Sequence, residues 1–355
     1  MDLFGLFAEE IVTAVADCGL EKYRGRQIAE WLYQRRVRDF AAMTNLSKAQ
    51  RTILADRFVI SPIRLAAQQQ SEDKQTTKLL LTLQDGLSVE TVLMRHRYGN
   101  SVCVSTQVGC GMGCIFCAST LNGVARNLTA GEILAQVFAA GELLEAENEG
   151  VNSIVIMGSG EPLANYDNVL RFIRLCHQDY CLNLSYRSFT LSTAGLVAGI
   201  DRLAAEELPL TLAVSLHAPN DALRSKIMPI NRQYPLGEVL AAADRYAART
   251  GRRVTYEYTL FAGLNDQDEH ARELAALLKG RLANVNLIPV NPVPESGLSR
   301  PDQVRIARFH EVLRAGRINA TIRREMGSDI RAACGQLRQA VLDGDINLSA
   351  DKQDR

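Results

Sequence analysis

The chain has 355 residues, which suits two compact domains, and its 47% hydrophobic and 23% charged residues are typical of a globular protein. No apolar run approaches the roughly 18 residues that a membrane-spanning helix needs, so we expect no membrane partner. The formal net charge is zero and therefore neither favours nor excludes a nucleic-acid partner.

The first residues, Met1–Val12, lack the basic start and the cleavage site of a secretory signal. We therefore expect a cytoplasmic protein. In a reducing cytosol, the eight cysteines favour metal binding or catalysis over structural disulfides.

Residues 1–75 are expected to form an N-terminal helical accessory domain. Helical spacing of apolar residues occurs in AEEIVTAVADCGL and RGRQIAEWLYQRR, and Gly19 and Gly25 are expected to interrupt these helices. Between residues 23 and 38, five arginines alternate with aromatic residues, a composition that suits RNA phosphates and bases. The alternative is an ordinary solvated amphipathic helix. The polar stretch 61–78 is expected to be a connector.

Residues 76–100 predict a β-hairpin extension, with Asp85-Gly86 as its turn. From there to residue 338, strand patterns and helix patterns alternate, which predicts a parallel sheet with helices packed outside. We count six such units in residues 101–338, too few for a closed eight-fold barrel. The expected fold is therefore α/β, a partial (β/α)6 barrel, followed by a polar tail at 339–355.

Three cysteines, Cys110, Cys114 and Cys117, lie on one loop that follows a predicted strand. This spacing wraps three thiolates around three corners of a cubane iron–sulfur cluster and leaves the fourth iron open. An open metal position is typical of a catalytic site. Glycines at 109, 111 and 113 favour a tightly wrapped backbone. The alternative is a zinc knot closed by Cys103.

This loop resembles the radical S-adenosylmethionine (SAM) superfamily, whose motif also has an aromatic residue before the last cysteine, here Phe116. The resemblance extends to the adenine-methylating RlmN/Cfr family and covers most of residues 80–338. One departure is Ser159, where the family often has methionine. The stretches that carry the resemblance are, in chain order, CVSTQVGCGMGCIFCAST, MGSGEPLANYDNVL, LSTAG, AVSLHAPND, KIMPINRQYP, VNLIPVNP and DIRAACGQL.

The resemblance implies a [4Fe-4S] cluster held by the three cysteines, with SAM at the fourth iron. It also implies three catalytic residues. Cys334 carries a methyl group, Cys103 later forms a transient disulfide with Cys334, and Glu90 accepts a proton. Without the resemblance, Cys334 would be read as a small buried hydrophobe and Glu90 as an exposed strand residue. Glu90 can reach a substrate only if the hairpin folds over the barrel mouth.

The same resemblance assigns SAM contacts, and these fall after or at the carboxyl ends of predicted strands, where ligands bind in open α/β folds. Taken alone, His217 would be a hydrogen-bonded core histidine. The implied contacts are Gly160, Glu161, Ser192, Ser215, Leu216, His217 and Asn291.

The function implied is methylation of adenine C2 in 23S rRNA and in certain tRNAs, with an electron donor such as flavodoxin or ferredoxin. We expect the enzyme to act as a monomer. One alternative is methylation at adenine C8. Pro162 favours C2 instead, because the C8 branch typically has alanine at this position. A second alternative, from another class, is a zinc-stabilised RNA-binding module without catalysis.

Overall fold

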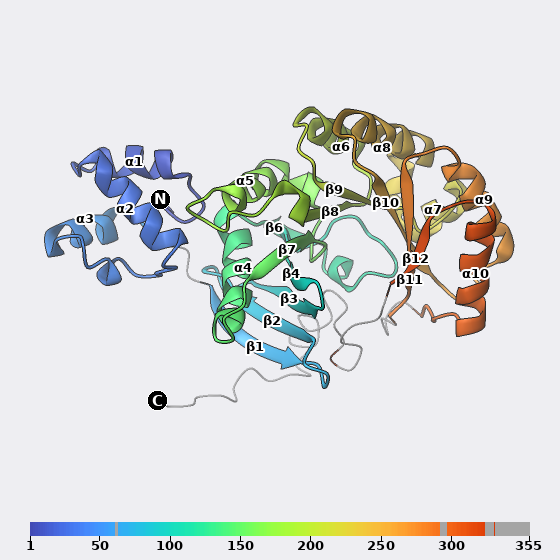
Figure 1. The fold of residues 1–355 in the computed structure, drawn as a ribbon, viewed down its shortest axis with the longest axis horizontal. Coiled ribbons are helices and arrows are strands. Elements are labelled where there is room, and N and C mark those ends of the chain that lie inside the picture. Colours follow the sequence, from blue (N-terminus) through green and yellow to red (C-terminus); the bar gives the residue numbers. More distant parts are fainter. Residues whose placement is uncertain (61–62, 292–296, 324–329, 331–355) are drawn as a thin grey trace.

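A single curved sheet of ten strands organises the part of the chain that the computed structural model describes, namely residues 1–60, 63–291, 297–323 and 330 (Figure 1). Seven neighbouring strands of this sheet run parallel. They are β4 (Gly99–Cys103), β7 (Val151–Ile156), β8 (Phe189–Thr193), β9 (Thr211–Ser215), β10 (Val254–Leu260), β11 (Ala283–Pro289) and β12 (Ala320–Ile322).

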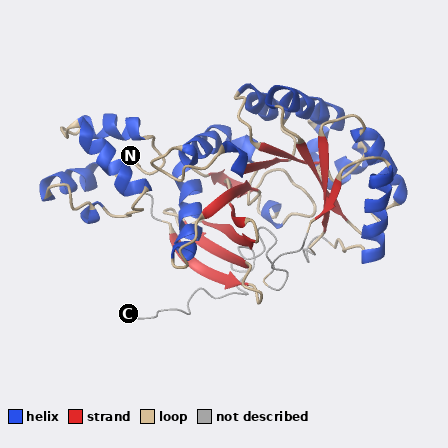
Figure 2. Cartoon of the chain, viewed as in Figure 1, coloured by secondary structure: helices blue, strands red, loops and turns tan. Residues whose placement is uncertain are grey.

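Each parallel strand is joined to the next by helix-containing chain, and the linking helices lie mainly outside the curved sheet (Figure 2). Six strand–helix units result, so the partial (β/α)6 barrel is confirmed. The seventh strand, β12, was missed by the sequence pattern because it has only three residues. The helices are α4 (Ala130–Glu145), α5 (Tyr166–His177), α6 (Val197–Ala205), α7 (Asp221–Ile227), α8 (Leu236–Thr250), α9 (Asp268–Leu278) and α10 (Gln303–Ala315).

Helix α4 is the most deeply buried of these helices because it is covered on two sides, by the sheet and by the N-terminal lobe. A capping box starts it: the Thr129 hydroxyl accepts from the Glu132 amide, and the Glu132 carboxylate accepts from the Thr129 amide. Its sequence is apolar almost all the way round, as expected for a helix enclosed on both sides.

Three antiparallel strands extend the sheet beyond β4. They are β1 (Arg64–Gln70), β2 (Thr76–Thr82) and β3 (Ser88–His96). The β2–β3 hairpin confirms the predicted turn, with Gly86 at a φ of +83°. The prediction that residues 61–78 are a connector is wrong for β1, an edge strand with a bulge between Leu65 and Ala67. The hairpin continues the sheet and does not fold over the barrel mouth, so the condition expected for Glu90 is not met in that form. Glu90 lies instead on a strand of the sheet itself.

The N-terminal lobe contains α1 (Ala8–Ala16), α2 (Lys22–Tyr33) and α3 (Lys48–Arg57), as expected for a helical accessory region. Gly19 follows α1 with a φ of +81°. The prediction that Gly25 interrupts a helix is wrong, because Gly25 lies inside α2. A Cβ atom there would lie 2.4 Å from the Val12 Cα of α1. The glycine therefore allows α1 and α2 to pack closely.

The lobe is fastened to the barrel through α4. Arg36 pairs with Glu145 and Arg38 with Glu142, both on α4. The Arg36 guanidinium also lies over the Phe138 ring, 4.9 Å from its centre. No described helix is long and apolar enough to cross a membrane. The tail 339–355 lies outside the described residues, and the division of the chain into domains stays a prediction.

Candidate active site

The cysteine loop is held at both ends by short strands, β5 (Gln107–Gly109) and β6 (Val124–Asn127), which pair with each other. The Cys110 amide donates to the Gly123 carbonyl at 3.0 Å. Gly109 has a φ of +81°, and a Cβ atom there would lie 2.0 Å from the Gly123 carbonyl oxygen. Only glycine fits, and the backbone turns sharply into the loop.

Within the loop, side-chain bonds fix the backbone around the cysteines. The Thr120 hydroxyl donates to the carbonyls of Cys114, at 3.2 Å, and Cys117, at 2.9 Å. On the other side, the Ile115 amide donates to the Ile227 carbonyl at the end of α7. The loop is therefore a preformed frame for the three thiols.

The chemistry of these thiols fits an iron–sulfur cluster. Burial raises the pKa of Cys110 to about 11, and it raises the pKa of Cys114 with help from Cys117 and Cys110. Thiols of this kind become thiolates when a metal group binds them. No three His, Cys, Asp or Glu side chains among the described residues are close enough to hold one metal ion. The three cysteines are the kind of ligand that an iron–sulfur cluster takes, and the zinc knot with Cys103 stays the alternative.

The glycine-rich stretch after β7 packs directly on the cysteine loop. Gly160 has a φ of +104°, and a Cβ atom there would lie 2.6 Å from the Gln107 Cβ. Its amide lies near enough to the Cys110 thiol to lower the pKa of that thiol, against the effect of burial. The neighbouring Ser159 is buried, and its amide donates to the Ser105 hydroxyl. The predicted SAM contact Gly160 therefore lies beside the predicted cluster.

Glu161 connects the ends of two strands. Its carboxylate accepts hydrogen bonds from the Thr193 hydroxyl at 2.8 Å and the Ala194 amide at 2.7 Å, both at the end of β8. The Leu163 amide donates to it as well, at 3.0 Å. Burial raises the pKa of Glu161 to about 7, and these three donors oppose the rise. Glu161 thus shapes the edge at which SAM is predicted to bind.

Arg224 organises the same edge from α7. Its guanidinium is fully buried and donates to the backbone carbonyls of Ala194 at 2.7 Å, Ser215 at 3.0 Å and Leu216 at 3.3 Å. These carbonyls terminate β8 and β9. Ser215 and Leu216 are predicted SAM contacts, so the cation fixes the backbone around two of them.

His217 is neutral and tightly held. Its Nδ1 accepts from the Thr259 amide at 2.9 Å, which leaves the ring proton on Nε2. Burial lowers the pKa of His217 to about 3, and the Arg224 charge adds to this. The Phe116 ring of the cysteine loop meets the imidazole edge to face at 4.8 Å. The histidine is hydrogen-bonded as a core residue, yet it also touches the predicted cluster loop.

The remaining predicted SAM contacts lie on the same side of the barrel. The Ser192 hydroxyl donates to the Glu257 carboxylate at 3.3 Å, between β8 and β10. Asn291 is half-buried and lies just after β11. The amide of its neighbour Val290 donates to the carbonyl of Leu260 at the end of β10. The structure therefore gathers residues from four parallel strands at one edge.

Two of the three predicted catalytic residues lie on the concave face of the sheet. The Thr91 hydroxyl donates to Gln136 of α4, so Thr91 faces the outer helices and its neighbour Glu90 faces inward. Cys103 pairs with Val92 and shares this inner face. Burial raises the pKa of Cys103 to about 11, with Arg323 opposing and Glu90 adding to the rise. Cys334 lies outside the described residues.

Comparisons with known proteins show the family to which this chain belongs. A radical SAM superfamily model matches residues 104–275, and a model of the ribosomal RNA large subunit methyltransferase N-terminal domain matches residues 1–60. A curated relative from Symbiobacterium thermophilum, named "Probable dual-specificity RNA methyltransferase RlmN", is 53% identical and covers 94% of this chain and 90% of its own. The chain belongs to the RlmN family.

Other RlmN relatives agree. One from Bacillus licheniformis is 51% identical, over 95% of this chain and 93% of its own. The crystal structure of a radical SAM methyltransferase from Sphaerobacter thermophilus has a TM-score of 0.91 and 48% identity, and covers 95% of this chain and 98% of that one. The fold expectation is thereby confirmed, and this RlmN-family chain is a radical SAM methyltransferase.

Sequence reasoning missed three buried charged residues of this RlmN-family barrel. Arg224 supports the SAM edge, Glu257 bonds Ser192, and Lys78 on β2 forms an ion pair with Glu90. The available signal was a charged residue inside an otherwise uncharged strand, as in TTKLLLT and VTYEYTL. Such a residue needs a partner on a neighbouring strand or in a ligand.

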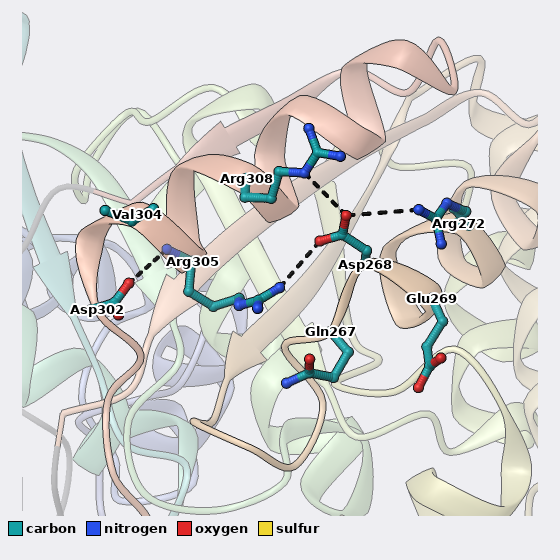
Figure 3. Close-up of a pocket in the computed structure, with 8 residues that line it drawn as sticks. All are labelled: Gln267, Asp268, Glu269, Arg272, Asp302, Val304, Arg305 and Arg308. Atoms are coloured by element: carbon teal, nitrogen blue, oxygen red, sulfur yellow. Dashed lines mark hydrogen bonds and ion pairs between the residues drawn. The ribbon is translucent and has the colours of Figure 1, made fainter.

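A surface hollow of about 500 Å³ lies between the first turns of α9 and α10 (Figure 3). Its centre is the Asp268 carboxylate, which pairs with Arg305 at 3.2 Å, Arg308 at 3.0 Å and Arg272 at 3.7 Å. No described residue of the predicted RlmN site lines it. The hollow is a charged joint between two outer helices rather than the catalytic centre.

Proposed function

We propose that the chain methylates C2 of a specific adenosine in the peptidyl-transferase region of 23S rRNA and of an anticodon-loop adenosine in certain tRNAs. Curated relatives of high identity are named dual-specificity RNA methyltransferases. The observation that carries the proposal is the shared inner face of Glu90 and Cys103, beside an edge suited to a cluster and SAM.

Adenine C2 is an electron-poor ring carbon without a lone pair that could attack a sulfonium methyl group. A carbon radical avoids this difficulty, and when bound, the cluster and SAM supply one. The protein must then hold the methyl carbon, orient the base, accept the C2 proton and release the product. Three residues are proposed for these tasks.

Cys334 takes a methyl group from one SAM, and the methyl carbon, once it has lost a hydrogen atom, bonds to adenine C2. Glu90 accepts the C2 proton, and the electron pair of that bond stays with the base. The Cys103 thiolate then attacks the Cys334 sulfur, so that a disulfide forms and the carbon–sulfur bond to RNA breaks. The electron pair of that bond passes to the methylene carbon, which takes up a proton and becomes the methyl group. The unpaired electron left by the radical addition would return to the cluster when it is bound. Glu90 and Cys103 share one face of neighbouring strands, which suits consecutive steps.

The two outer cysteines are expected to fail differently when replaced. Cys334→Ala removes the sulfur that carries the methyl group, so no RNA adduct begins. Cys103→Ala leaves that sulfur and removes the thiol that resolves the adduct. We expect a reduction-resistant, nuclease-sensitive protein–RNA band only for Cys103→Ala, on denaturing gels of protein copurified with cellular RNA. The same result for both variants would contradict these roles.

The position of the new methyl group separates C2 from C8 chemistry. Pro162 begins a short 3-10 helix directly after Glu161, and the C8 branch typically has alanine at this place. Mass spectrometry of nucleosides from wild-type and deletion strains is expected to show loss of 2-methyladenosine. Loss of 8-methyladenosine would favour the alternative.

The remaining partners follow from this chemistry. The cluster requires one electron per radical, for which flavodoxin or ferredoxin is the proposed donor. We propose that the enzyme is cytoplasmic, since its RNA substrates and these donors are found in the cytoplasm. We also propose that it acts as a monomer. Sedimentation of the loaded enzyme with and without RNA tests the oligomeric state.

A further inference from the structure

Lys78 lies in the middle of β2 and faces the inside of the barrel. In the β2–β3 register, Leu79 lies opposite Thr91, which faces the outer helices. Side chains alternate along a strand, so Lys78 faces the opposite way, like Glu90. Lys78 pairs with Val92 and Val92 with Cys103, so all three occupy one row across the inner face.

The Lys78 ammonium lies 3.3 Å from the Glu90 carboxylate. The side chain of Lys78 is 0% exposed and that of Glu90 is 2% exposed. Lysine is among the residues least often fully buried, and taking two charges out of water is costly. A buried ion pair of this kind is weak as a source of stability, because apolar residues of similar size often serve better.

The pair lies where the proposed mechanism needs a charged base. A carboxylate that removes a proton must also be held in a fixed position within hydrogen-bond reach of that proton, and an ion pair with a neighbouring strand does this. Among the described residues, a second carboxylate that acts on Cys103 is that of Glu257, which accepts a hydrogen bond from the Ser192 hydroxyl. Lys78 forms its ion pair with Glu90, whereas the bond described for the Glu257 carboxylate comes from a neutral hydroxyl.

We propose that Lys78 is a positioning residue for Glu90: its ammonium holds the Glu90 carboxylate in an ion pair and directs it over the inner face. This inference rests on the proposed function. In the step it supports, the C2–H bond breaks, the proton moves to a Glu90 oxygen, and the electron pair of the bond stays with the adenine ring. In this proposal Lys78 acts through Glu90 and not directly on the substrate.

The test uses the full chain, reconstituted with its cluster, together with SAM and an rRNA fragment. Lys78→Met is expected to lower methylated product about 100-fold, in the range that a general base contributes. Cleavage of SAM and methylation of Cys334 should stay near wild type. The nuclease-sensitive protein–RNA adduct should accumulate, as it should in Glu90→Gln, because both stop at proton removal.

Two further variants control for charge and for folding. Lys78→Arg keeps the positive charge and is expected to form methylated product at least about tenfold faster than Lys78→Met. Leu80→Met lies on the same strand and inner face and conserves volume, so it should behave like wild type. Product formation by Lys78→Met at the wild-type rate would overturn the inference.

A double variant keeps the inference testable if Lys78→Met folds poorly. Lys78→Met with Glu90→Gln removes both charges of the ion pair, and it should turn over like Glu90→Gln alone, because residues that act as a unit are not additive. A further loss of turnover, multiplied onto that of Glu90→Gln, would show a separate or structural role. Absence of any adduct in Cys103→Ala and Glu90→Gln would contradict the proposed function itself, and not only the role of Lys78.

Discussion

At the residue scale, Cys103 shows how the environment of one thiol sets its use. Burial is the main reason that its pKa rises to about 11, and the Glu90 and Glu257 carboxylates add to the rise. Arg323 and a hydrogen bond from the Met157 amide oppose it. A thiol of this kind is unreactive in the resting protein, because the thiolate is the nucleophile. The raised pKa thereby protects Cys103 from reagents that need the thiolate.

Alkylation measures this protection. In the metal-free protein, iodoacetamide should modify Cys103 about tenfold faster for each pH unit between about 8 and 10, with a plateau above about 11, because only the thiolate reacts. Glu90→Gln removes a negative charge that opposes ionisation, so its plateau should begin at lower pH. Peptide mass spectrometry identifies the modified cysteine. A plateau already present at pH 9 in the unaltered protein would refute this account.

The site residues divide by how local their signal is. The three loop cysteines were recognisable because their spacing within eight residues is itself the motif. Glu90 and Cys103 gained their roles only through resemblance, and Lys78 and Glu257 gained none. Their importance comes from the register between strands, which places residues 12 apart, such as Lys78 and Glu90, in contact. A single sequence does not fix that register.

At the element scale, the arginines of the N-terminal lobe separate into two groups. Arg35 is exposed and lies over the Trp31 ring, 4.2 Å from its centre. Arg36 and Arg38 instead form ion pairs with glutamates of α4. The composition of residues 23–38 alone did not distinguish these groups, because the partners come from a helix about 100 residues later. RNA contact is therefore expected from Arg35, and lobe attachment from Arg36.

Single substitutions should separate the two tasks. Arg35→Ala is expected to reduce the slope of log binding constant against log salt by about 1, as the loss of one phosphate contact does. Arg36→Ala should leave that slope unchanged and raise hydrogen exchange in α2 and α4. Filter binding at several salt concentrations gives the first result and exchange mass spectrometry the second. A changed salt slope for Arg36→Ala alone would reverse the assignment.

At the scale of the whole molecule, the main apolar core and the cluster loop are separate. The large core runs from Leu3 in the N-terminal lobe to Ile318 before β12. Cys114 belongs to a second, smaller apolar cluster with residues such as Ile227 and Phe261. Stability of the fold therefore depends mainly on a core that does not contain the cluster ligands.

Removal of the cluster should accordingly leave the fold intact. After chelation under reducing conditions, the far-ultraviolet circular dichroism should be preserved and Tm should fall by no more than about 5 °C, because one kcal/mol shifts Tm by only a few degrees in a large domain. A structural zinc site would behave differently, since such sites contribute about 10–16 kcal/mol of apparent binding energy to folding. Loss of secondary structure on chelation would favour the zinc-stabilised module.

The sequence predicted the repeated strand–helix units well, because each unit carries its own alternation of apolar patterns. It failed at the two ends of the sheet. β1 is rich in glutamine and largely exposed, so it lacks the apolar alternation of a half-buried strand, and β12 is too short to show a pattern. Both strands owe their conformation to pairing with a neighbour, which is tertiary information.

These two outer strands have a consequence for solubility. An unclosed sheet has two borders whose backbone groups can recruit strands from other chains. The bulge between Leu65 and Ala67 disrupts the regular ladder of β1, and β12 offers only three residues for pairing. The features that made these strands hard to recognise are thus ones that disfavour pairing with strands of other chains.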